Sequence, residues 1–145
     1  MSRKNSFQFE DNSGKINKAL RQIGVTGMTK AASMVEDTVK PLVPVDSGAL
    51  RDHITHTVEA TGSEVIGKVG TPHKYGPYVE FGTGEFAENG AGRKGGWTYK
   101  APDGSWVHTY GSPAQPFLRP GFRAAKSKIE KTIGDEYAIS FKGGD

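Results

Sequence analysis

One stretch of the sequence joins an aromatic segment to a glycine-rich turn: Tyr75-Gly76-Pro77-Tyr78-Val79-Glu80-Phe81-Gly82-Thr83-Gly84. Residues 75–81 are mostly apolar and aromatic. They are compatible with a strand or with one turn of helix, because a proline near the start is tolerated in both. The Gly-Thr-Gly that follows predicts a sharp turn, since glycine adopts backbone conformations that strain other residues.

One charge lies inside this apolar segment, because Glu80 stands between Val79 and Phe81. A carboxylate in such a place either faces solvent or is buried as the partner of an arginine. Arg51 and Arg119 are the candidate partners, and each belongs to a further stretch rich in turn-forming residues.

The upstream stretch reads Pro44-Val45-Asp46-Ser47-Gly48-Ala49-Leu50-Arg51, and the downstream stretch reads Pro113-Ala114-Gln115-Pro116-Phe117-Leu118-Arg119-Pro120. Asp46 or Ser47 is expected to cap a short helix over 47–54, with Leu50 facing inward. Pro120 is expected in the first turn of a C-terminal helix. Where the three stretches meet, we expect one core formed by Leu50, Tyr78, Phe81, Phe117, Leu118 and Phe122.

In this order and spacing, the three stretches resemble the gp-ten-like tail-component family of long-tailed bacteriophages, over roughly residues 15–135. The residues that carry the resemblance are Asp46, Ser47, Gly48, Leu50, Arg51, Tyr78, Glu80, Phe81, Gly82, Thr83, Gly84, Pro116, Phe117, Leu118, Arg119 and Pro120. The resemblance implies a small structural protein of the virion neck or tail and not an enzyme. It also implies a small sheet packed against long helices.

Apolar residues recur at steps of three and four from about residue 13 to 42 and from 118 to 133, which predicts two long helices. Asn12 or Ser13 is expected to cap the first helix. Gly24 and Gly27 predict a bend or break in its middle. Gly134 is the expected end of the second helix, and residues 137–141 are expected to form a short last strand.

Two β-hairpins are predicted, one over 54–70 and one over 97–110, because turn residues separate paired β-rich runs. Strands and helices fall into separate runs, which indicates an α+β fold with an antiparallel sheet. We expect one domain over 13–141, a length that allows a single modest core. A mobile arm at 1–12, with Phe7 and Phe9 as anchors, and a flexible tail at 142–145 complete the chain.

Residues 82–112 are expected to form an extended loop and hairpin inserted into this domain. Six of the 15 residues over 82–96 are glycine, which predicts flexibility. The aromatic residues are expected to pair across the hairpin strands and to offer an outer face for contact. The residues predicted to form an intersubunit contact are Trp97, Tyr99, Trp106, Tyr110, Arg93 and Lys94.

Composition restricts the classes of function. The chain has no cysteine, which excludes disulfides and thiolate metal sites. Its net charge of +3, with acids and bases interspersed, does not indicate nucleic-acid binding. Neither a bilayer-spanning apolar run nor a signal-peptide core after Met1 is recognisable, so we expect assembly in the host cytoplasm and no membrane partner.

Candidates for chemistry are sparse. His53 and His56 would share a helix face and begin a metal site, but the nearby acids lack a ligand pattern. A hydrolase would need a cluster among His53, His56, His73, His108, Asp46 and Glu80. Since no Ser-His-Asp or phosphate-binding glycine pattern is recognisable, we expect no catalytic residue, metal or cofactor.

From the resemblance to the tail-component family we expect a virion protein at the head–tail junction or the top of the tail, acting in tail completion or as a neck protein. Copies are expected to form a ring, six-fold or twelve-fold, in contact with neck, tail-terminator or tail-tube proteins. The insertion is expected to be mobile in the free subunit and ordered in the virion. Alternatives are a tail-terminator or head-closure protein, a nucleic-acid-binding module and a hydrolase.

Overall fold

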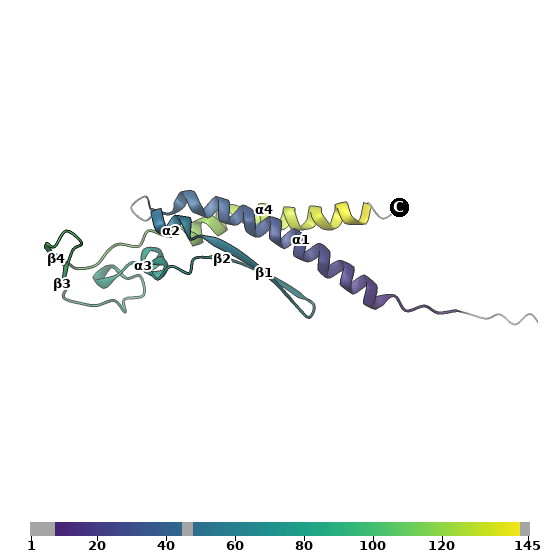
Figure 1. Cartoon of the computed structure of the whole chain (residues 1–145), viewed down its shortest axis with the longest axis horizontal. Helices are drawn as coiled ribbons and strands as arrows, with labels where there is room; N and C mark the ends of the chain where they lie inside the picture. The colour runs from purple at the N-terminus through teal and green to yellow at the C-terminus, as the bar shows by residue number, and fades with distance from the viewer. Residues whose placement is uncertain (1–7, 45–47, 143–145) are drawn as a thin grey trace, which may run out of the picture.

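The computed structural model describes residues 8–44 and 48–142, and its elements form an α+β fold (Figure 1). In chain order they are α1 (Ser13–Val39), η1 (Lys40–Leu42), α2 (Gly48–Asp52), β1 (Thr55–Thr61), β2 (Glu64–Gly70), α3 (Gly76–Phe81), η3 (Gly84–Phe86), β3 (Trp97–Lys100), β4 (Trp106–Thr109) and α4 (Leu118–Lys142). Two long helices and two antiparallel hairpins confirm the fold class and both predicted hairpins. Asp46 and Ser47, the predicted cap of the short helix, lie outside the described residues.

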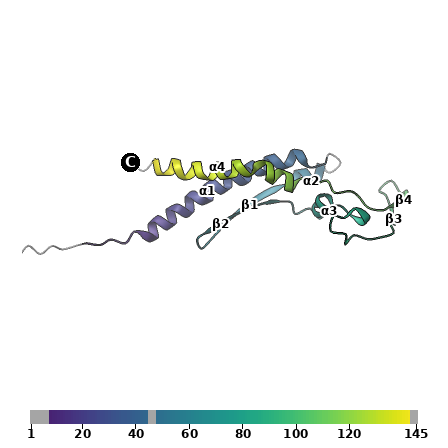
Figure 2. The same cartoon turned by 180° about the vertical axis from the view of Figure 1, so that it is seen from behind.

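The helices α1 and α4 lie side by side and run in opposite directions (Figures 1 and 2). Small residues allow this close approach. A Cβ atom added to Gly121 would lie 2.5 Å from Cγ2 of Val39, and one added to Gly27 would lie 3.3 Å from Cβ of Glu136. Gly24 and Gly27 are both buried, and α1 continues through them without interruption, so the predicted break is wrong. Their helix-weakening effect is offset by tight packing between the helices.

Helix α4 is longer than the sequence predicts. It continues through Gly134 to Lys142, so the predicted strand over 137–141 is wrong. Tyr137 donates a hydrogen bond to the carbonyl oxygen of Leu20 at 3.4 Å, and the Glu136 carboxylate lies 2.6 Å from Nζ of Lys30. These contacts with α1 stabilise the turns beyond the glycine, because packing usually outweighs local helix propensity.

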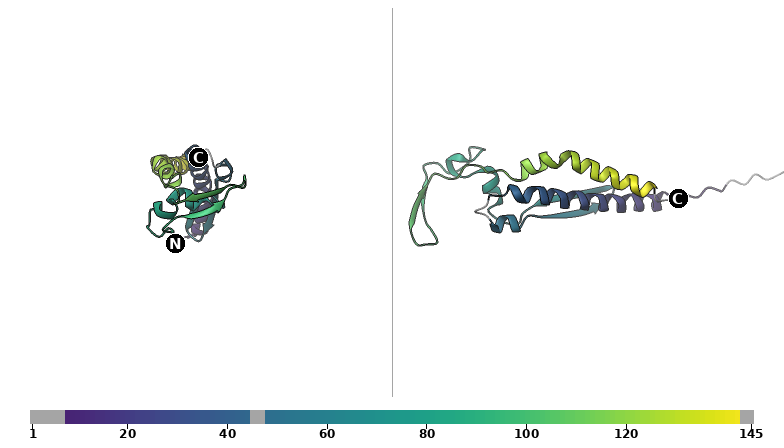
Figure 3. Two further views of the ribbon diagram at one scale, coloured as in Figure 1. Left: turned by 90° about the vertical axis from the view of Figure 1, so that its left-hand side faces the viewer. Right: turned by 90° about the horizontal axis from the view of Figure 1, so that it is seen from above.

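The β1–β2 hairpin packs against α1 on a side that α4 leaves uncovered (Figure 3). Its register pairs Thr55 with Gly70 and Thr61 with Glu64. A Cβ atom added to Gly67 would lie 2.7 Å from Sδ of Met28, so this glycine lets the methionine rest on β2. Helix α1 is therefore the central element of the molecule.

The core lies where the end of α1, α2 and the start of α4 meet. Its buried members are Val35, Val39, Val43, Leu50, Ile54, Phe117 and Ala125, and Leu118 packs against them. Tyr78, Phe81 and Phe122 are exposed, so their predicted place in this core is wrong. The inward positions of α3 are taken by Gly76 and Glu80, and a six-residue helix buries only one narrow side.

The described part of the molecule is elongated, with the start of α1 at one end and the β3–β4 hairpin at the other (Figures 1 and 3). The described residues 8–12 continue outward from α1, and Phe9 is 90% exposed. The backbone N–H of Ser13 donates to Oδ1 of Asp11 at 2.9 Å, whereas the side chain of Asn12 makes no capping bond. Asp11 therefore replaces the predicted cap.

Candidate assembly surface

Glu80 joins α3 to the N-terminus of α4. Its residue is only 2% exposed, and its carboxylate accepts hydrogen bonds from the backbone N–H groups of Phe117, Leu118 and Arg119 at 2.8, 3.0 and 3.1 Å. The first N–H groups of a helix lack partners within the helix, and a negative charge there is stabilised by the helix dipole. The acid that interrupts the apolar segment is thus the N-terminal cap of the last helix.

The side chain of Arg119 completes the site. Its Nε lies 2.9 Å from Oε1 of Glu80, and its two terminal nitrogens lie 2.9 and 3.1 Å from the carboxylate oxygens of Glu88. The guanidinium also lies 4.8 Å from the centre of the Phe81 ring. Of the two arginines suggested by the sequence, Arg119 is the partner, whereas Arg51 pairs weakly with its exposed neighbour Asp52 at 3.4 Å.

The charges of this site are set by their hydrogen bonds. Burial acts to raise the pKa of Glu80, but the backbone N–H groups of Phe117 and Leu118 and the Arg119 side chain outweigh it, so the pKa lies below the ordinary value. The carboxylates of Glu88 and then Glu80 raise the pKa of Arg119. Both side chains are therefore charged at neutral pH, and they hold α3, the following loop and α4 together.

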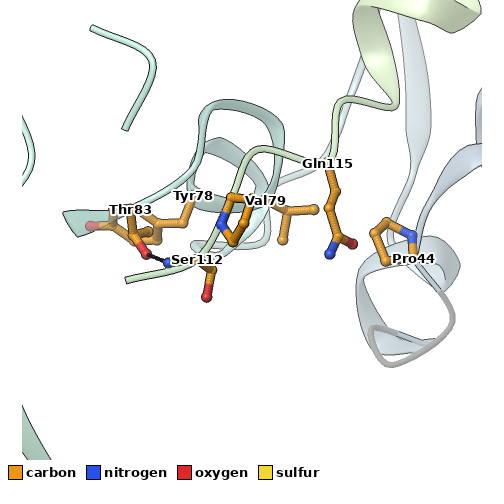
Figure 4. A pocket seen from close by; sticks show the side chains of 7 residues that line it. Pro44, Tyr78, Val79, Thr83, Ser112 and Gln115 are labelled. Carbon is orange, nitrogen blue, oxygen red and sulfur yellow. Dashed lines mark hydrogen bonds between the residues drawn. The ribbon is translucent and has the colours of Figure 1, made fainter. Parts of the chain in front are cut away.

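The insertion begins and ends at a narrow base closed by the main chain. The N–H of Thr83 donates to the carbonyl oxygen of Ser112 at 2.9 Å, and the N–H of Glu85 donates to that of Tyr110 at 2.9 Å. The Thr83 hydroxyl accepts from the N–H of Ser112 at 2.9 Å, as Figure 4 shows. Gly82 and Gly84 have φ values of 79° and 60°, the positive values that glycine was expected to supply at this turn.

An aromatic cleft lies between α3 and the loop that follows it. We call it the α3 cleft; it measures about 360 Å³ and has a mostly apolar lining that includes Tyr78, Phe81, Ala87, Ala91 and Arg93. Tyr78 is 61% exposed although it belongs to the helix, and Tyr75 and Phe86 are also exposed near it. Large aromatic side chains that remain in water at one end of a small protein are typical of a contact surface.

The β3–β4 hairpin carries its aromatic residues on both faces. Tyr99 lies opposite Val107, and Trp106 lies opposite Lys100, so the predicted cross-strand pairing of aromatics is wrong. Trp97 is half-buried beside Gly84 and lies 5.7 Å from the Arg93 guanidinium, whereas Trp106 is 72% exposed. Tyr99, Tyr110, Arg93 and Lys94 are exposed as well. The predicted contact residues therefore share one end of the molecule but not one face.

The histidines take part in local contacts. Nδ1 of His53 lies 2.5 Å from the carbonyl oxygen of Ala49, and that of His56 lies 2.5 Å from the carboxylate of Glu36. His73 packs against Tyr75, and Nδ1 of His108 lies 3.0 Å from the Thr98 hydroxyl. Within residues 8–44 and 48–142, no three histidine or acidic side chains are grouped to hold a metal ion. The four histidines therefore make contacts within and between neighbouring elements.

Sequence reasoning missed two members of this surface. Glu88 reaches Arg119 because the loop turns back, with its N–H bonded to the carbonyl oxygen of Phe81 at 3.0 Å, and no local pattern marks that return. Tyr78 was assigned to the core because apolar residues are usually buried. The spacing between Tyr78 and Glu80 could have indicated that Tyr78 is exposed. Residues two apart point to different sides of a helix, and Glu80 takes the buried side of α3.

The family described as "Bacteriophage HK97-gp10, putative tail-component" matches residues 7–82 of the chain. The chain belongs to this family. Curated proteins give no match, and solved structures give none. The matched part includes α1 through α3, with the stretch 44–51 and residues 75–82 of the stretch 75–84, whereas residues 83–112 and α4 follow it.

Membership in the HK97-gp10 family makes the chain a bacteriophage tail component, and hence a virion protein whose partners are other tail proteins. A structural family of this kind supports a non-enzymatic role. None of the described helices is long and apolar enough to cross a bilayer.

Proposed function

We propose that this tail component completes the tail or joins it to the head by forming a ring at the neck or at the top of the tail. The observation that carries the proposal is the crowding of water-exposed aromatic side chains at one end of an elongated subunit. They are Tyr75, Tyr78, Phe81, Phe86, Trp106 and Tyr110. Aromatic residues of this kind supply much of the binding energy of protein interfaces.

In the proposed ring, six or twelve copies surround the tail axis. We call α1, α2, the β1–β2 hairpin and α4 the helical body, and α3 with residues 82–112 the exposed end. The helical body of each copy supports its exposed end. Contacts between unlike surfaces of neighbouring copies close into a ring when their rotation allows it. Trp97, Tyr99, Trp106, Tyr110, Arg93 and Lys94 belong to the end that contacts a neighbouring copy or the adjoining neck, terminator or tube protein. A tail-terminator or head-closure role uses the same surface, and the location of the protein in the virion distinguishes these roles.

Binding to nucleic acid is less favoured. Over residues 85–112 the bases Arg93, Lys94 and Lys100 are matched by the acids Glu85, Glu88 and Asp103. DNA binding depends on a net positive surface and falls steeply with salt.

The first experiment measures assembly of the purified protein by sedimentation velocity and negative-stain electron microscopy over a range of concentrations. We expect closed rings, and weaker assembly for Trp106→Ala than for Ile66→Ala, which removes an exposed apolar side chain from the hairpin beside α1. A wild-type protein that stays monomeric at every concentration contradicts the ring.

The second experiment uses phage that carry Gly82→Val. An added Cβ there would lie 2.8 Å from the carbonyl oxygen of Phe86 and 2.9 Å from the N–H nitrogen of Ala114. We expect filled heads and tails that do not join, visible by electron microscopy of the lysate. Gly90→Val is the matched control, because Gly90 also has a positive φ but no atom within 4 Å of an added Cβ. A variant lacking all four histidines should still join heads to tails.

Hydrogen exchange of residues 82–112 tests how the exposed end assembles. We expect fast exchange in the free subunit and slow exchange in the virion, because glycine-rich segments are ordered by binding. Equally slow exchange in both states would mean that the insertion is already fixed in the subunit.

A further inference from the structure

Phe9 is a large apolar side chain that the described part of the subunit leaves almost fully exposed. It is 90% exposed, on a short segment that leads outward from α1 (Figure 1). Burying a phenylalanine side chain is favourable by about 1.5–3 kcal/mol, so an exposed one on an extended segment is suited to insertion into a pocket.

The α3 cleft lies at the opposite end of the molecule, and its size and lining suit one aromatic side chain. Its floor and walls are formed by Tyr78, Phe81 and the backbone of residues 82–84, with Ala87 and Ala91 on the loop side. Aromatic rings pack edge-to-face or offset-stacked, which the two exposed rings of α3 offer to an entering phenylalanine.

Charges at the two places are complementary. Glu10 and Asp11 follow Phe9 directly, and Arg93 at the cleft is followed by Lys94. Within the described residues, Glu10, Arg93 and Lys94 form no ion pair, and Asp11 bonds only to the start of α1. Opposite charges such as Glu10 and Arg93 attract each other, and complementary charges fix the orientation of a contact.

Phe9 cannot reach the cleft of its own subunit. It precedes Ser13 by four residues, a reach of at most about 14 Å. The 27 residues of α1 span about 40 Å, and the cleft lies beyond their far end. The occupant must therefore come from a different molecule.

We infer that Phe9 of one subunit inserts into the α3 cleft of the next, with Glu10 against the Arg93 side of the cleft. This contact joins two unlike surfaces at opposite ends of the subunit, which is the kind of contact that propagates around a ring. The inference rests on the proposed ring and names the segment and the cleft that close it.

Disulfide crosslinking tests the contact directly, because the chain has no natural cysteine. Gln8→Cys protein, which keeps Phe9, is mixed with Ala91→Cys protein, allowed to assemble and oxidised. We expect a crosslinked dimer from this mixture but not from either protein alone. Ala138→Cys, at an exposed position near the far end of α4, replaces Ala91→Cys in the control mixture and should give none.

Substitutions in the arm give the second readout, the concentration at which rings form. Phe9→Ala should raise it about 10- to 100-fold, whereas the neighbouring Gln8→Ala should leave it unchanged. Glu10→Arg and Arg93→Glu should each raise it about two- to five-fold, and the double variant should recover most of the loss.

The outcomes separate the arm contact from the ring itself. Rings that assemble normally with Phe9→Ala, or assembled rings that give no crosslink between positions 8 and 91, overturn the arm contact but do not contradict the ring. Equal crosslinking to position 138 also overturns it. A wild-type protein that never forms rings contradicts both the arm contact and the proposed ring.

Discussion

The helical body and the exposed end of this tail component handle their apolar residues in opposite ways. The core of the body buries its apolar side chains, such as Val35, Val39 and Phe117, beside long helices that glycines bring close together. The exposed end leaves aromatic side chains such as Tyr78 and Trp106 in water. Burial of apolar side chains in the body stabilises the subunit. Exposed aromatic side chains do not stabilise the isolated subunit and are typical of a surface that a partner covers. The difference separates residues that fold the protein from residues available for binding.

The largest expected effect comes from removing a buried aromatic side chain from the body. Phe117 is fully buried, so Phe117→Ala should lower the free energy of unfolding by about 3–5 kcal/mol. The matched variant Phe86→Ala changes an exposed ring at the other end and should cost less than about 0.5 kcal/mol. Urea denaturation measures both, and equal losses would show that the two regions do not differ in this way.

A somewhat smaller effect is expected where the two regions are joined. Glu80→Gln removes a charge that accepts three backbone N–H bonds and one arginine bond, which should cost about 2–3 kcal/mol at neutral pH. Glu88→Gln, at the exposed side of the same arginine, should cost about 1 kcal/mol or less. Similar losses for both variants would contradict a buried cap.

The pH dependence of the Glu80 contribution follows from its lowered pKa. The contribution is fully present above the unfolded-state value of 4.5 and is lost as pH falls through the lower folded-state value. The difference in stability between wild type and Glu80→Gln should therefore be constant above about pH 5 and shrink in acid. Denaturation curves from pH 7 to pH 3 test this, and a difference that grows in acid would contradict it.

The smallest effects concern glycines of α4. Gly134 is helical with no atom within 4 Å of an added Cβ, so Gly134→Ala should stabilise the protein by about 0.5–1 kcal/mol. Gly121→Ala should destabilise it, because the same methyl group would lie 2.5 Å from Cγ2 of Val39. Thermal unfolding of the two variants checks whether close packing, and not helix propensity, determines where glycine is needed.

The sequence predicted the elements well where local patterns determine them. Periodic apolar residues gave both long helices, and turn residues gave both hairpins. The predictions of where helices end or break were wrong where a contact with a residue far away in the sequence determines the local structure. The turns after Gly134 are helical because Tyr137 and Glu136 contact α1, and α1 is continuous at Gly27 because α4 packs there.

The candidate site was predicted in part for the same reason. Glu80 and Arg119 were recognised as possible partners because a charge in an apolar segment requires one. The three backbone N–H groups that Glu80 caps, and the return of Glu88 to Arg119, depend on the fold of the loop between them. The outward direction of Tyr78 depends on the few residues that α3 can bury.

The closed base of the insertion makes its tip replaceable. Main-chain and hydroxyl hydrogen bonds join Thr83 to Ser112. The two ends of the insertion therefore lie next to each other, whatever residues connect them. Loops with adjacent ends tolerate insertions and exchange of sequence. Residues between the two ends of this base can therefore change in number or sequence while the fold of the helices stays the same.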